Sequence, residues 1–122
     1  MMYHYIKVKI QPKGPQAARI RQRKYDLMRR FQIPDNLLPG SLSLQYARCG
    51  KPNCRCTEGE GHSMWSLTYM ADGKKHVQHI PKNLVEEVRK RVEAGREYQD
   101  AVREVLAANA RLLTLARKQR LI

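Results

Sequence analysis

The sequence predicts an α+β protein, a small antiparallel β-meander with a zinc-knuckle loop, a basic N-terminal helix and a long C-terminal helical region. Three observations support this prediction. Short runs of alternating apolar residues indicate strands, an Asp-Gly pair joins two of these runs, and the sequence after Pro81 has a helical period with no further proline. The chain then divides into a basic strand-helix arm over 1–40, the zinc-knuckle meander over 41–81 and a helical segment over 82–122.

The arm begins with a strand-like alternation over residues 2–10, which places Met2, Ile6 and Val8 on one side and the tyrosines and lysines on the other. Prolines at positions 12 and 15 end this run. Residues 16–32 then follow a helical period. We expect a helix there, with an apolar stripe formed by Ile20, Leu27, Met28 and Phe31.

The meander is predicted from three strand-like runs, over residues 41–48, 64–70 and 75–81. Asp72 and Gly73 separate the last two runs. Such a pair is typical of a tight hairpin turn, because both turn residues require a positive φ. The cysteine-containing loop joins the first two strands, and the run over 2–10 is a candidate fourth strand.

The C-terminal region is predicted to be helical from Pro81 onward, since proline suits a helix start and Glu86 and Glu87 suit the positive end of the helix dipole. Gly95 is a candidate break that would divide the region into two helices. Beyond it, apolar residues fall in heptads, and Asn109 at an a position suits a parallel homodimer. The alternative is that the helix folds back on its own chain. The residues expected at the dimer interface are Tyr98, Val102, Val105, Asn109 and Leu112.

The cysteines of the chain, Cys49, Cys54 and Cys56, lie within eight residues of one another. The N-terminus lacks the apolar stretch of a signal peptide, so we expect a reducing, cytoplasmic location, where clustered cysteines are more often metal ligands than disulfides. A closed structural Zn²⁺ site needs four ligands. His62 is the favoured fourth ligand, because glycines 59 and 61 let the chain turn back; His76, His79 and the remote His4 are alternatives.

These cysteines also carry a resemblance. Residues 48–56 read Arg-Cys-Gly-Lys-Pro-Asn-Cys-Arg-Cys, and a Gly-His pair, an aromatic strand, an Asp-Gly-Lys turn and an Ile-Pro-Lys helix start follow. Over about residues 40–98 the chain resembles a family of small, uncharacterised prokaryotic proteins with an R-C-G-K-P-x-C-x-C core. The resemblance implies the metal site and the hairpin, and it suggests an accessory of prokaryotic mobile or host DNA.

The charge of the chain indicates the class of partner. A formal net charge of +13 and a pI near 10.1 favour a polyanion such as DNA or RNA. In the arm, Asp26 is the sole acid before Pro34. Candidate phosphate contacts lie in the arm helix, in the cysteine loop, and at the hairpin turn, which we expect near that loop. They are Arg19, Arg21, Arg23, Lys24, Arg29, Arg30, Arg48, Lys51, Arg55, Lys74 and Lys75.

Other classes of function find less support in the sequence. It has no nucleotide-binding loop, no zinc-protease motif and no nucleophile elbow, and a closed zinc site leaves no position for a substrate, so we expect no enzyme. The basic helix lacks the apolar anchors of a membrane-surface helix. The first hypothesis is therefore a zinc-binding accessory or regulatory protein that binds nucleic acid. The alternative is an adaptor whose helices bind a larger protein or ribonucleoprotein complex.

Overall fold

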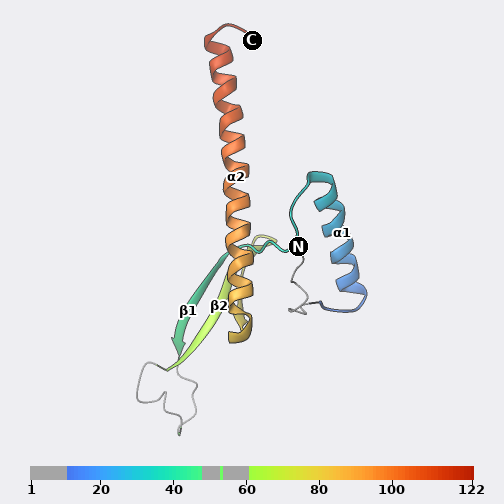
Figure 1. Cartoon of the computed structure of the whole chain (residues 1–122), viewed down its shortest axis with the longest axis vertical. Coiled ribbons are helices and arrows are strands. Elements are labelled where there is room, and N and C mark those ends of the chain that lie inside the picture. Colours follow the sequence, from blue (N-terminus) through green and yellow to red (C-terminus); the bar gives the residue numbers. More distant parts are fainter. Residues whose placement is uncertain (1–10, 48–52, 54–60) are drawn as a thin grey trace.

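The computed structural model describes residues 11–47, 53 and 61–122, and it confirms the α+β class (Figure 1). The elements follow one another as helix α1 (Pro15–Phe31), strands β1 (Ser41–Ala47), β2 (His62–Ala71) and β3 (Lys74–Ile80), a short 3-10 helix η3 (Lys82–Leu84) and helix α2 (Val85–Lys118). The predicted strand over 2–10 and most of the cysteine loop lie outside the described residues.

Helix α1 has the predicted bounds to within a residue, and local signals explain both ends. Pro15 occupies the first helical position, where a missing N–H costs nothing. At the other end Gln32 adopts a left-handed conformation with φ 55°, and the N–H groups of Gln32 and Ile33 donate to the Met28 carbonyl. Every residue of α1 is at least partly exposed. Its expected apolar stripe is therefore covered only in part, because Ile20 and Phe31 face solvent.

The three strands form one antiparallel sheet in the order β1-β2-β3, as the sequence predicts. Ala47 pairs with His62 where β1 and β2 meet the cysteine loop, and Ala71 pairs with Lys74 across the hairpin. The two turn residues Asp72 and Gly73 both have positive φ, 54° and 74°, which is the geometry expected of a two-residue hairpin.

The core lies between one face of the sheet and the beginning of α2. Leu67 and Ile80 of the sheet are buried together with Val85, Val88 and Val92, which follow a spacing of three and four residues along α2. Partly buried apolar residues surround this cluster: Leu38, Leu42, Trp65, Tyr69 and Leu84. Only the first three turns of α2 therefore contribute to the core.

The connection between α1 and β1 packs directly against α2 at Gly95. Leu38 donates its N–H to the carbonyl of Arg91 at 3.1 Å, and Arg96 donates to the carbonyl of Gly40 at 3.2 Å. A side chain at position 95 would collide with the Leu38 carbonyl oxygen, so the close approach requires glycine. The prediction that Gly95 breaks the helix is wrong: α2 is continuous through it.

Beyond Gly95, α2 extends away from the sheet and from α1 (Figure 1). At about 1.5 Å per residue its 34 residues span about 51 Å. In the part of the chain that the structure describes, no helix has both the length and the apolar character that crossing a membrane requires.

The contact at Gly95 is testable by Gly95→Ala. Alanine normally stabilises a helix interior by about 1 kcal/mol relative to glycine. Here we expect the opposite sign, a loss of about 1–3 kcal/mol in the free energy of unfolding, because the new methyl group overpacks the Leu38 backbone. The control is Ala94→Gly at the exposed neighbouring position, which should cost only the intrinsic helix propensity. Thermal unfolding measures both, and a higher Tm for Gly95→Ala would contradict the contact.

Candidate nucleic-acid interface

Helix α1 presents a row of three exposed arginines, Arg19, Arg23 and Arg30. At 3.6 residues per turn, these positions fall within about 40° of one another around the helix axis. The three arginines lie on the side of α1 that is opposite to Ala17, Lys24 and Met28. None of the three guanidinium groups forms an ion pair with a carboxylate among the residues that the structure describes. We call this set the arginine row.

The other three cations of α1 have local partners. Lys24 lies 2.9 Å from the carboxylate of Asp35, and Arg29 lies 2.7 Å from that of Asp26. Arg21 donates to the backbone carbonyl of Pro12 at 2.7 Å. The structure thus separates six arm residues that the sequence treated as one group. Three belong to the arginine row, in which Arg30 lies 5.0 Å from the centre of the Phe31 ring, and three contact an oxygen atom within the chain. Asp35 could have indicated this division, because it pairs with Lys24, but the sequence analysis did not consider it as a partner.

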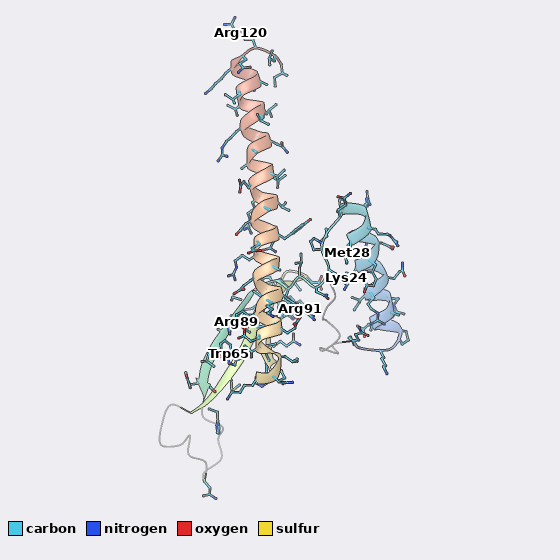
Figure 2. The ribbon with its side chains drawn as sticks, in the orientation of Figure 1. Lys24, Met28, Trp65, Arg89, Arg91 and Arg120 are labelled. Carbon is cyan, nitrogen blue, oxygen red and sulfur yellow. The ribbon has the colours of Figure 1, made fainter. Side chains whose placement is uncertain are left out.

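A cleft of about 830 Å³ lies between α1 and α2. It is bordered by Ile20, Arg21 and Lys24 of α1, by Asp35 of the following segment and by Arg91 of α2. Figure 2 labels Lys24 and Arg91, one on each bordering helix. Two of the cations that border this cleft are already paired, since Lys24 contacts Asp35 and Arg91 contacts Glu87 at 2.8 Å, and the Asp35 carboxylate itself lies in the lining. The cleft is therefore a less suitable phosphate site than the arginine row.

The predicted zinc ligands Cys49, Cys54 and Cys56 lie outside the described residues, and so do the loop cations Arg48, Lys51 and Arg55. His62 is described. It is the first residue of β2, it is exposed, and it pairs with the last residue of β1. His62 therefore sits where the cysteine loop leaves and rejoins the sheet. The described residues include no group of three or more ligands that could hold a metal ion.

The sheet register places the other candidate histidines farther from this loop. His76 pairs with Tyr69, seven residues along β2 from His62, a separation of about 23 Å along the strand. Its ring stacks on that of Tyr69 with centroids 5.1 Å apart. His79 pairs with Ser66, about 13 Å along β2 from His62. Position alone thus favours His62 over His79, and both over His76, as the fourth ligand.

Lys74 and Lys75 lie at the opposite end of β2 from Ala47 and His62, the described residues that flank the cysteine loop. They are exposed at the start of β3, next to the hairpin turn. That turn follows the last residue of β2, whereas His62 is its first, and the ten residues of the strand separate the turn from His62 by about 30 Å.

The aromatic residues that could stack on bases differ in exposure. Trp65 and Tyr69 pack against the core, and the guanidinium of Arg89 lies 5.2 Å from the centre of the Trp65 ring (Figure 2). This cation–π contact was not predicted from the sequence. Tyr46 is 53% exposed and is the last residue but one of β1, close to where the cysteine loop begins. Of the three, Tyr46 is the one suited to contact a ligand.

The position of His62 leads to a prediction about the metal. We expect one Zn²⁺ per chain, held by the three cysteines and His62, so that His62→Ala lowers the zinc content of anaerobically purified protein. His76→Ala is the matched control and should retain the metal, because that histidine lies at the other end of the sheet. Elemental analysis measures both. Zinc well below one equivalent in the unmodified protein would contradict the site, and zinc lost only in His79→Ala would contradict the choice of ligand.

Comparison with known proteins identifies one relationship. A family model described as a domain of unknown function, DUF6788, matches residues 16–90. This range covers α1, the sheet and the first turns of α2. No curated protein and no solved structure matches the chain. Since the family model covers more than half of the sequence, the chain belongs to the DUF6788 family.

Proposed function

We propose that this protein binds nucleic acid, mainly through phosphate contacts, as an accessory or regulatory factor. The observation that carries the proposal is the arginine row of α1: three exposed guanidinium groups on one side of a helix, with no carboxylate partner among the described residues. Arginine is well suited to phosphates because its planar fork can donate two hydrogen bonds at once. The proposal covers DNA and RNA, since phosphates are common to both.

The distribution of charge supports the same partner. Residues 1–40 contain nine Lys or Arg and two acids, and both acids, Asp26 and Asp35, form ion pairs with neighbouring cations. The excess positive charge of the arm therefore remains available to an external polyanion. Each contact between a basic side chain and a phosphate releases condensed counterions from the nucleic acid. This release increases the affinity of the protein for the nucleic acid.

The cysteine loop is the second proposed contact. A zinc ion would fix its backbone, and Arg48, Lys51 and Arg55 would then be held among the ligands at one end of the sheet. Tyr46 lies at that end, and its exposed ring could stack on an unpaired base. In this arrangement the arginine row supplies most of the affinity, and the loop orients the protein on its ligand.

The adaptor function is the second candidate, and the exposed apolar residues of α2 beyond Gly95 favour it. An adaptor would bind a larger protein or ribonucleoprotein complex through this helix. The adaptor function predicts weak nucleic-acid binding by the isolated protein, whereas the first proposal predicts tight binding with a steep dependence on salt.

Two double variants with equal loss of charge test the proposal. In Arg19→Ala/Arg23→Ala the arginine row is shortened, and we expect weaker binding to all sequences and a salt slope flatter by about 0.9 per lost contact on duplex DNA. In Lys24→Ala/Arg29→Ala two internally paired cations are removed from the same helix, so the slope should change little. Filter binding at increasing salt measures both. Equal losses in the two variants would contradict the assignment of the row.

A further inference from the structure

At one end of the sheet, β1 and β2 extend past the third strand as a two-stranded ribbon. The pairing of β2 with β3 ends at Trp65 and Ile80, whereas the pairing of β2 with β1 continues to Ala47 and His62. After Ile80 the chain turns into η3 and α2, and the ends of β1 and β2 project away from α2 (Figure 1). The last residues of β1 therefore lie beyond the part of the sheet that packs in the core.

One face of this ribbon carries an exposed aromatic ring next to an exposed apolar side chain. Leu44 and Tyr46 are two residues apart in β1, so they lie on the same face of the sheet, about 7 Å apart along the strand. Leu42, on this face of the same strand, packs against the core, but Leu44 is 40% exposed and Tyr46 is 53% exposed. We call Leu44 and Tyr46 the ribbon patch. Since β1 is an edge strand, the patch is open on one side as well as from above.

The charge around the ribbon patch suits a polyanion. The three strands contain no acidic residue, while β3 begins with two lysines. The side chain of Arg89 lies on the same face, since its guanidinium is 5.2 Å from the centre of the ring of Trp65, the residue that pairs with Leu44. Arg89 also contacts the exposed carboxylate of Glu86 at 3.3 Å. A phosphate chain can therefore approach the patch without meeting a carboxylate of the sheet.

On the basis of the nucleic-acid function proposed above, we propose that the ribbon patch stacks on unpaired bases and that single-stranded nucleic acid is the preferred ligand. Aromatic rings stack on the bases of single strands with little regard to sequence, because every base presents a flat face. In a duplex the neighbouring base pairs cover these faces, and a base must first be unpaired and unstacked at a cost in free energy. Tyr46 therefore contributes to the binding of a single strand but not to that of an intact duplex.

The size of the ribbon patch favours a base over a protein partner. A standard protein–protein interface buries about 800 Å² on each partner, which two partly exposed side chains do not supply. A single base, by contrast, is about as large as the ring on which it stacks. The patch thus matches one or two unpaired bases.

The positions of the two contact regions also favour a flexible ligand. Helix α1, which carries the arginine row, and the end of β1 lie on opposite sides of α2 (Figure 1). Duplex DNA has a persistence length of about 150 base pairs, so bending it around a protein of 14.2 kDa is costly. A single strand bends readily. One strand can therefore place its phosphates on the arginine row and an unpaired base on Tyr46.

Binding of the full-length protein to two ligands tests this inference. The ligands are a single-stranded DNA of about 20 nucleotides without self-complementarity and the same strand annealed to its complement. At high salt, where phosphate contacts are weakened, we expect the single strand to bind more tightly than the duplex. Tyr46→Ala should weaken single-strand binding by about five- to tenfold, the effect of losing one base–aromatic stack, and leave duplex binding unchanged.

Two further variants serve as controls. Tyr46→Phe keeps the ring and should retain the affinity for the single strand. Val77→Ala shortens an exposed apolar side chain on the opposite face of the sheet, since Val77 pairs with Thr68, and should leave both affinities unchanged. Tyr46→Ala removes no charge, so its salt slope should equal that of the unmodified protein, unlike the slope of Arg19→Ala/Arg23→Ala.

Three results would overturn the inference and leave the proposed function intact. They are a duplex bound at least as tightly as the single strand at high salt, a single-strand affinity that Tyr46→Ala does not change, and equal losses on both ligands in Tyr46→Ala. A protein that binds neither ligand at any salt concentration would contradict the proposed function itself, and the inference with it.

Discussion

The close contact between Leu38 and Gly95 is the constraint on which the rest of the structure depends. It joins the segment before β1 to the third turn of α2, through the hydrogen bond from Leu38 to the Arg91 carbonyl and the one from Arg96 to the Gly40 carbonyl. Gly40 is equally constrained, because a side chain there would collide with the Thr68 carbonyl oxygen of β2. These two glycines bring helix, connection and sheet together, and the buried valines of α2 all precede Gly95 along the helix.

The consequence is a helix with two different parts. Up to Gly95, α2 buries Val85, Val88 and Val92 against the sheet, and after it the apolar residues are exposed. Among the residues that the structure describes, the core contains five buried apolar residues, which is a small number for a folded domain. Such a core leaves room for further stabilisation. The proposed zinc ion would supply it at one end of the sheet.

The elements of the fold could be predicted from the sequence wherever the signal is local. Pro15 and the residues after it indicate α1, alternation indicates the strands, and Asp72-Gly73 indicates the hairpin. Gly95 was misinterpreted because its role depends on tertiary packing. The low helix propensity of glycine suggests a break in the helix, whereas here the absence of a side chain allows the Leu38 backbone to pack against α2.

Less of the candidate site could be predicted, for the same reason. The sequence identifies six basic residues in α1 but does not show that Asp35, eleven residues after Lys24, returns to pair with it. Ion pairs and separations across the fold depend on how the elements pack. The sequence lists the charged groups, and the structure decides which of them remain available to a ligand.

The central claim is that α2 has two parts, of which only the first, up to Gly95, is held by its own sheet. Amide hydrogen exchange, followed as a function of protein concentration, tests it most directly. An unpartnered helix of this length is marginal in water, so its amides exchange rapidly unless a partner protects them. We expect amides of Val88–Gly95 to be well protected at all concentrations, and amides of Val102–Leu113 to exchange much faster at low protein concentration. High protection of Val102–Leu113 at low protein concentration would contradict the account.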